Sequence, residues 1–471
     1  MKLFTNSNER NASLGIVERG SFMLGNVGTI LINAVIASFL MFYYTDIMRL
    51  NAGIIGTIFL ASRVFDGITD LVMGFIVDRT RSRHGKGRVW ILRTCIPYAI
   101  SGILLVSVPG GSTEIIQYIY IFITYNLCNA IFLTAISVAY NSMMCTITSN
   151  PYEHGLLGVF VTFGASLGAV LVQTTIDSAT KAFGGDAKAW QIVVAGYAVL
   201  GLIFHLICFF FTKERAGEAV DLVQAGEHQK ISLKKSIHTL FHNHYWILAN
   251  IVCFMITLIN GLSAGSGMYY VKSVFGDTSY YAGIANALSI TNLLALFISP
   301  LFMKRMGKRN TMLLGTIVAM ISSVLRGLGG LGGGNLTVVT AASAMTGLGL
   351  GLLASGVYGM VADTIDYGEW KMGLKTAGIG FSGVTFGTKV ANGLASVFMG
   401  WVINISGYNG SLTIQPAKAV IFVNASMNYI PAVCCLVVVI CLFAYKLDKL
   451  YPQIQKDLEE RKSQNKTRKG D

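Results

Sequence analysis

Hydrophobic residues along this chain fall into blocks of about twenty, separated by short polar or basic segments. A block of this length matches the number of helical residues needed to cross the hydrocarbon layer of a membrane. The blocks lack the alternation of apolar and polar residues that is typical of a transmembrane strand, so they predict helices. The twelve predicted spans cover residues 22–45, 52–77, 89–109, 115–140, 156–178, 189–212, 245–271, 279–302, 311–331, 337–360, 379–406 and 419–445.

The order of these spans predicts two related halves. Six spans precede a long polar segment and six follow it, and short basic loops recur after the second and the eighth span. Such an arrangement indicates two pseudo-symmetric six-helix halves around a shared cavity, the major-facilitator plan. We expect an all-α integral membrane fold with an N-terminal half at 1–212, a cytoplasmic central loop at 213–243, a C-terminal half at 244–445 and a charged, solvated or surface-lying cytoplasmic tail at 446–471.

Composition and charge support the membrane interpretation. Hydrophobic residues make up 53% of the 471 residues and charged residues only 13%, about half the charged share of ordinary soluble domains. The formal net charge of +13 raises the possibility of a nucleic-acid partner, but most Lys and Arg residues fall on one predicted side. This bias is the positive-inside signature, which predicts a plasma-membrane protein with both termini in the cytoplasm and no nucleic-acid partner. The exceptions predicted outside are Arg49, Lys181, Lys188, Lys272 and Lys418.

Charged residues within the predicted spans require a reason, because burial of a charge in the bilayer costs at least ~2.5–3.5 kcal/mol. Asp66 and Asp70 lie four residues apart in the second span, and Arg63 precedes them, so all three share one helix face. Two close carboxylates repel unless a cation or a proton lies between them. The pair therefore fits a site for Na⁺ or H⁺, or a buried charge network with Arg63 and with Lys389 of the eleventh span. Arg326 lies near an outer helix end, where its side chain could extend to the membrane surface.

An acidic motif follows the tenth span. Asp363, Asp366 and Glu369 are predicted on the cytoplasmic side, which also carries the arginine-rich loop with Arg81 and Arg83. Opposite charges of the two halves could close a cytoplasmic gate, although an ordinary solvated loop would have the same composition.

Four motifs together resemble the glycoside–pentoside–hexuronide:cation symporter family, to which the melibiose permease belongs. They lie at 42–46, 63–70, 81–86 and 362–371, and the resemblance extends from about residue 20 to 445. It implies that Asp66 and Asp70 bind the coupling cation, that Thr134 belongs to the same cage, and that Lys389 lies close to it.

The resemblance weakens at the sugar site. Where the melibiose permease has aspartates in the first and fourth spans, this chain has Ile30 and Ser137. Its fifth-span arginine aligns with Phe160, and its two galactoside-contacting tryptophans align with Asn141 and Ala354. Melibiose is therefore not the expected substrate, and another glycoside, a hexuronide or a non-sugar stays open.

Polar residues in the equivalent cavity are the candidate substrate ligands. They are Asn26, Asn33, Ser137 and Asn141, with Tyr140 as a stacking face. We expect cation-coupled symport of a glycoside by alternating access, with no cofactor beyond Na⁺ or H⁺, no resident metal and no obligate protein partner. The alternatives are transport of a non-sugar or amphiphilic solute and a non-transporting membrane sensor. No nucleophile and base pair, metal set or phosphate-binding loop indicates an enzyme.

Overall fold

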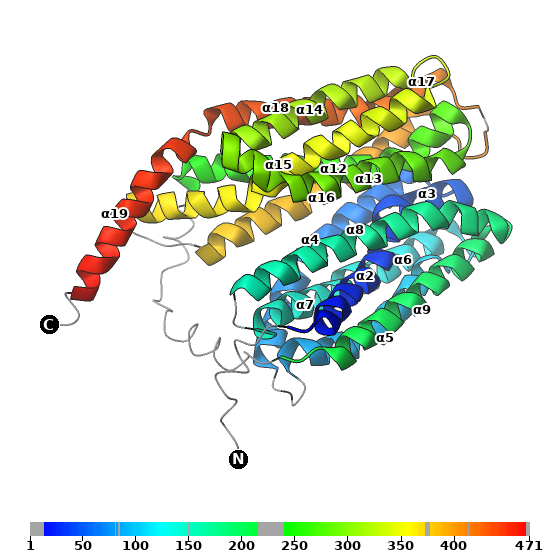
Figure 1. The fold of residues 1–471 in the computed structure, drawn as a ribbon. Helices are drawn as coiled ribbons and strands as arrows, with labels where there is room; N and C mark the ends of the chain where they lie inside the picture. The colour runs from blue at the N-terminus through cyan, green and yellow to red at the C-terminus, as the bar shows by residue number, and fades with distance from the viewer. Residues whose placement is uncertain are drawn as a thin grey trace. The chain divides into compact units, whose positions relative to one another are not determined.

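The computed structural model describes residues 14–80, 82, 85–148, 151–214, 240–372, 377–412 and 414–467 (Figure 1). Across these residues the regular secondary structure is helical, without a β-strand, which confirms the predicted all-α class. The helices up to residue 211 are α2 (Ile16–Ser38), α3 (Leu40–Phe42), η1 (Tyr43–Ile47), α4 (Ala52–Arg79), α5 (Lys86–Leu105), α6 (Glu114–Tyr125), η2 (Asn126–Leu133), α7 (Thr134–Thr146), α8 (Pro151–Ala182) and α9 (Ala187–Phe211). Those from residue 244 onward are α12 (His244–Phe275), η3 (Thr278–Tyr280), α13 (Tyr281–Met306), α14 (Lys308–Gly329), α15 (Leu336–Met372), α16 (Ala377–Ser406), α17 (Ala417–Asn424), η4 (Ala425–Tyr429), α18 (Ile430–Ala444) and α19 (Leu447–Thr467).

Ten helical segments of the described residues are long and apolar enough to cross a membrane, and each coincides with a predicted span. The second and eleventh predicted spans correspond to α4 and α16, which contain 28 and 30 residues. A helix rises about 1.5 Å per residue, so both are also long enough to span the hydrocarbon layer. The helices of the described residues are therefore consistent with the predicted count of twelve.

The first helix begins earlier than its predicted span, at Ile16 instead of residue 22. Polar residues continue this helix because each finds a partner. Arg19 forms an ion pair with the buried Glu153 of α8 at 2.8 Å, and Glu18 accepts a hydrogen bond from the backbone N–H of Lys213 at 3.0 Å. These contacts between distant segments are invisible to a hydropathy profile.

The chain forms two compact units. Unit 1 comprises Met1–His228, Ala264–Asn286 and Ser396–Val423, and unit 2 comprises Gln229–Ser263, Ala287–Ala395 and Asn424–Asp471. The predicted halves differ from these units because two segments that follow the central loop pack with the first six helices. We use the term "outer end" for the helix ends of unit 1 that hold Asp46, Asn51, Lys272 and Asn404, the side that the charge distribution predicts to face outward.

Three π-helices interrupt the membrane helices of the described chain. η1 contains Asp46, η2 ends directly before Thr134, and η4 contains Asn428. Such π-helical segments shift the helix register and are frequent at functional sites. Here each lies beside a buried charged or polar cluster.

Arg326 does not extend to the membrane surface, as the sequence suggested it could. Its side chain is fully buried in unit 2. Its Nε donates to Asn428 Oδ1 at 2.5 Å and its Nη2 donates to the Met427 carbonyl at 2.9 Å. Through these hydrogen bonds Arg326 connects α14 to the π-helix η4.

We expect Arg326→Met to lower the melting temperature of the purified protein markedly. Each hydrogen bond from a charged donor contributes about 1.5–3 kcal/mol, and the substitution also leaves two buried acceptors without this donor. Scanning fluorimetry would measure the change, with Arg305→Met, at an exposed arginine, as the control. Equal melting temperatures for the two variants would contradict the structural role of Arg326.

The C-terminal tail contains an ordered helix that packs on unit 2, which is more structure than the sequence predicted. One side of α19 carries Leu447, Ile454 and Leu458, all buried in the core of this unit. The spacing of these three residues matches one face of a helix, and this was the signal available in the sequence. Beside them, Tyr451 donates to Asp366 Oδ2 at 2.8 Å.

Candidate functional site

The intramembrane acids are held by α4. Asn51 caps the N-terminus of this helix: its side-chain oxygen accepts hydrogen bonds from the backbone N–H groups of Gly53 and Ile54 at 2.9 and 3.3 Å. Fourteen and eighteen residues after Ala52, the helix presents Asp66 and Asp70 one turn apart on the same face, as predicted. Asp66 is only 6% exposed, while Asp70 is partly buried.

Asp66 is the centre of a polar cluster. Its Oδ1 accepts a hydrogen bond from the Thr134 hydroxyl of α7 at 2.9 Å, and its Oδ2 lies 3.5 Å from Nη1 of Arg63. Thr134 is itself buried. The structure thus brings together three of the residues that the sequence and the family resemblance singled out. A carboxylate and a hydroxyl supply the hard oxygen ligands that alkali and alkaline-earth cations prefer.

Asn126 is a polar residue near this cluster that sequence reasoning missed. Its side-chain nitrogen donates to the Ser62 hydroxyl at 2.9 Å, and Ser62 lies one helical turn before Asp66. Its Oδ1 is buried and accepts no hydrogen bond from the described residues. An asparagine in the middle of an apolar span was the available signal. An acceptor oxygen without a donor fits a site that takes up a cation.

The predicted substrate residues are distributed over α2 and α7. Ser137 lies three residues after Thr134 and Asn141 lies four residues after Ser137, so the three residues share one helix face. Asn26 donates from its side chain to the Val161 carbonyl of α8 at 2.7 Å, which makes it a link between helices. Asn33 is partly buried on α2.

Tyr140 does not present the open stacking face that was predicted for it. Its ring stacks on Phe22 with a centroid distance of 4.3 Å. It belongs to a buried hydrophobic cluster with Met143 and Leu157, and the residue is 6% exposed. In this structure Tyr140 is a packing residue of the first six helices.

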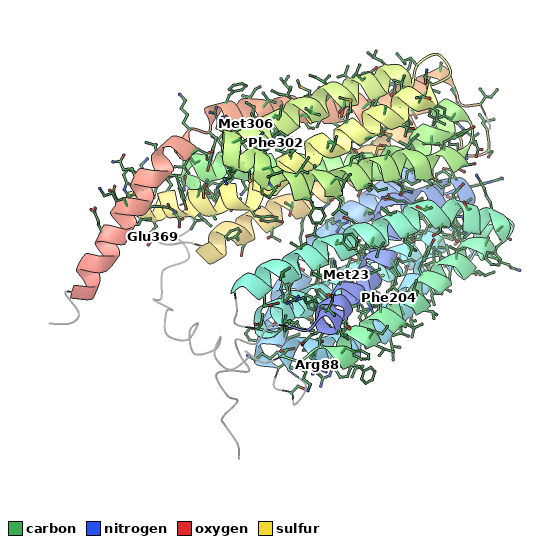
Figure 2. The ribbon with its side chains drawn as sticks, viewed as in Figure 1. Met23, Arg88, Phe204, Phe302, Met306 and Glu369 are labelled. Atoms are coloured by element: carbon green, nitrogen blue, oxygen red, sulfur yellow. The ribbon has the colours of Figure 1, made fainter. Side chains whose placement is uncertain are left out.

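The acids of the predicted cytoplasmic gate have partners within unit 2. Asp363 forms an ion pair with Lys308 of α14, and Asp366 accepts the hydrogen bond from Tyr451. Glu369 lies near the end of the same helix, α15 (Figure 2). The other side of the gate, Arg81 and Arg83, lies outside the described residues, so the gate itself stays a prediction.

Lys389, the intramembrane lysine of α16, lies in unit 2 and is partly buried. The acids of α4 lie in unit 1. The predicted proximity of Lys389 to these acids therefore stays a prediction.

The outer end of unit 1 contains a buried ion pair that was not predicted. Lys272 of α12 donates to Asp46 Oδ1 at 2.5 Å and to the Gly410 carbonyl at 2.6 Å. Asp46 also accepts the Tyr408 hydroxyl at 2.8 Å, and its side chain is 1% exposed. Burial, followed by the neighbouring Asp46 carboxylate, raises the pKa of Tyr408, so its hydroxyl stays a donor at neutral pH. The cluster joins η1 to α12 and to the segment between α16 and α17.

A second ion pair at the outer end is exposed to solvent. Lys181 lies 3.1 Å from Asp277, and their side chains are 48% and 51% exposed. Hydrogen bonds from the Ser279 side chain and backbone, with the Lys181 ammonium, lower the pKa of Asp277 to about 2. The carboxylate's contribution is therefore present above its ordinary pKa near 3.8 and is lost only as the pH falls toward 2. This bridge is intact throughout the physiological pH range.

Comparisons with known proteins agree with this fold. A family model described as MFS/sugar transport protein matches residues 21–449. The isoprimeverose transporter of Lactiplantibacillus pentosus is 31% identical over 451 residues, 95% of this chain and 92% of the relative. The glucuronide carrier protein homolog of Escherichia coli (strain K12) is 25% identical over 451 residues, 94% of this chain and 95% of the relative. The solved D-xylose-proton symporter superposes with a TM-score of 0.63 at 14% identity, covering 92% and 96% of the two chains, and this likeness shows the fold.

The long apolar helices and the family match define a multi-pass membrane transporter. The chain belongs to the MFS/sugar transport protein family of the major facilitator superfamily, and the predicted family resemblance is confirmed. Its relatives are transporters, not enzymes.

Proposed function

We propose that this protein is a symporter that couples the movement of Na⁺ or H⁺ across the plasma membrane to uptake of a glycoside. The observation that carries the proposal is the buried carboxylate of Asp66, which accepts the Thr134 hydroxyl and lies one turn from Asp70. An acid at this depth is costly, and in membrane proteins such residues mark ion pathways and proton relays.

The coupling ion would bind among these oxygen atoms. Na⁺ would take Asp66, Asp70 and Thr134 as ligands, with Asn126 Oδ1 as a further acceptor of suitable chemistry. H⁺ would instead protonate one carboxyl of the pair. In either case, neutralising the pair would favour one conformation of the transporter, and by linkage cation and substrate would bind more tightly together than singly.

Isoprimeverose is our first candidate substrate, because the relative from Lactiplantibacillus pentosus is named as a transporter of this sugar. A glucuronide is the second, after the Escherichia coli relative. Ser137 and Asn141 share the helix face of Thr134, so they are the residues we propose to contact the sugar beside the cation. A non-sugar substrate is the alternative, favoured by the residues that replace the sugar-binding acids and tryptophans, such as Ile30 and Ala354.

The test is uptake into proteoliposomes with imposed ion gradients. We expect isoprimeverose to accumulate when an inward Na⁺ or H⁺ gradient is present, and to equilibrate without accumulation when the gradients are collapsed. Glucuronide and a non-sugar solute serve as parallel substrates. Gradient-independent transport of every substrate would contradict cation coupling, whereas gradient-driven uptake of the non-sugar alone would retain symport and replace the substrate.

A further inference from the structure

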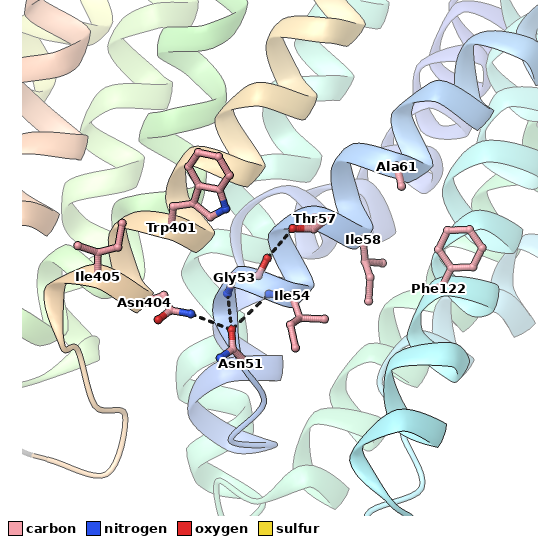
Figure 3. A pocket seen from close by; sticks show the side chains of 10 residues that line it. All are labelled: Asn51, Gly53, Ile54, Thr57, Ile58, Ala61, Phe122, Trp401, Asn404 and Ile405. Atoms are coloured by element: carbon pink, nitrogen blue, oxygen red, sulfur yellow. Dashed lines mark hydrogen bonds between the residues drawn. The ribbon is translucent and has the colours of Figure 1, made fainter.

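A groove of about 650 Å³ runs along α4 at the outer end (Figure 3). Its floor and walls are apolar, and its volume lies within the range of small-molecule sites. Six side chains form most of its lining: Ile54, Ile58 and Ala61 of α4, Trp401 and Ile405 of α16, and Phe122 of α6.

The groove faces the bilayer and not the cation site. Ile54 is 43% exposed, and the same helix face continues with Phe65 and Ile68, which are 53% and 58% exposed. Ala61 lies roughly 140° around the helix from Asp66, at 3.6 residues per turn. Because large apolar side chains stay exposed along this face of a membrane helix, the surrounding lipid is what covers them.

The outer mouth of the groove is polar. Asn404 donates from its side chain to Asn51 Oδ1 at 2.9 Å, so one asparagine from each wall closes the apolar part (Figure 3). Two residues before Asn51 lies Arg49, which is exposed and within about 7 Å along the chain. Arg49 forms no ion pair with any of the described residues. A cation with no acidic partner in the described part of the chain lies beside amide donors and above an apolar groove. This order of charge and hydrocarbon matches an anionic phospholipid.

We propose that this groove binds an anionic phospholipid of the outer leaflet, with one acyl chain along α4 and the phosphate held by Arg49 and the amide groups at the mouth. The ligand class follows from the two chemistries that the site combines. A sugar would leave its hydroxyl groups without partners in the apolar part, and a neutral lipid would leave Arg49 without a counter-ion.

The bound lipid would contact both α4 and α16, which pack closely against each other. The outer ends of α4 and α16 approach closely at Gly56 and Gly400, and a Cβ atom at Gly400 would lie 2.5 Å from the Ala52 carbonyl. A ligand that touches both helices binds best when they are together. The lipid therefore stabilises the state in which the outer end is closed.

The test measures lipid binding to the purified full chain in non-ionic detergent, by native mass spectrometry and by thermal shift. The probes are phosphatidylglycerol and phosphatidylcholine with identical acyl chains. Arg49→Gln tests the charge, with Lys188→Gln as its control at another exposed basic residue of the predicted outer side. Ala61→Trp fills the groove, and Ile68→Trp places the same side chain on the same face of α4 outside it.

We expect the wild type and both controls to prefer phosphatidylglycerol about fivefold, roughly the effect of one basic residue at an anionic membrane surface. Arg49→Gln should lose the preference and keep binding of both lipids, whereas Ala61→Trp should weaken both. Equal lipid preference in Arg49→Gln and Lys188→Gln would overturn the headgroup assignment, and unchanged binding in Ala61→Trp would overturn the groove. Since the readout is binding, its outcome is independent of the proposed transport function.

Discussion

Replacement of Asp66 by asparagine is expected to remove the dependence of substrate binding on the coupling cation. The substitution preserves the shape of the side chain but removes the negative charge from the centre of the cluster with Arg63 and Thr134. Coupling free energies between two ligands of one protein are typically 1–3 kcal/mol, so the cation should enhance substrate binding roughly 5- to 150-fold in the wild type. In Asp66→Asn this enhancement should fall to about one.

Calorimetric titration of the substrate, with and without Na⁺ and at two pH values, measures this enhancement. Asp70→Asn should behave in the same way. Thr134→Ser should retain the enhancement because serine keeps the hydroxyl group, whereas Thr134→Val removes this group and should reduce the enhancement. Asp177→Asn is the control, since this acid lies at the outer end, where it accepts the Thr278 hydroxyl at 2.7 Å. If substrate binding still depended fully on the cation in both Asp66→Asn and Asp70→Asn, these acids would have only a structural role.

Loss of the Lys272 ammonium is the second large effect that we expect. Lys272→Met leaves Asp46 as a buried carboxylate whose remaining donors include Tyr408 and Thr45, and removal of one partner of a buried ion pair costs about 3–5 kcal/mol. The melting temperature should therefore fall. The cluster joins η1 to later segments at the outer end, so the closed outer state should also lose population, and uptake should decrease with it.

A matched control is available in the exposed pair of Lys181 and Asp277. Lys181 also lies 2.8 Å from Asp177, but its own side chain is 48% exposed to solvent. Exposed ion pairs contribute about 0–1 kcal/mol, so Lys181→Met should change the melting temperature and uptake far less than Lys272→Met. The double variant Asp46→Asn/Lys272→Met should recover stability relative to Lys272→Met, because the uncompensated charge is gone. Equal effects of Lys272→Met and Lys181→Met would show that the buried cluster has no special role.

Gly410 is part of the same buried cluster, because its carbonyl accepts a hydrogen bond from Lys272. A Cβ atom at this position would lie 2.8 Å from Asp46 Oδ1 and 2.9 Å from its Cα, closer than such atoms approach. The loop between α16 and α17 therefore needs glycine here to bring its carbonyl to Lys272. The local sequence predicts neither the need for glycine at this position nor the partner of its carbonyl group.

The sequence by itself determined the membrane class, the position of each span and the two acids of α4. These follow from local patterns: blocks of apolar residues whose length matches the bilayer, and a spacing of four residues that places Asp66 and Asp70 on one helix face. The cost of burying a charge in lipid made these acids conspicuous without any knowledge of their neighbours.

Only the tertiary structure decided how distant residues combine. In the folded chain, Arg326 is buried against η4 and Tyr140 lies in a packed core. Tyr451 forms a hydrogen bond with Asp366, and Asp46 forms an ion pair with Lys272. Hydropathy cannot distinguish these roles, because an arginine or tyrosine near a helix end has the same local pattern whether it meets lipid, solvent or a partner. The partner lies from about 85 to more than 200 residues away in each pair, and its position is fixed by the packing of whole helices.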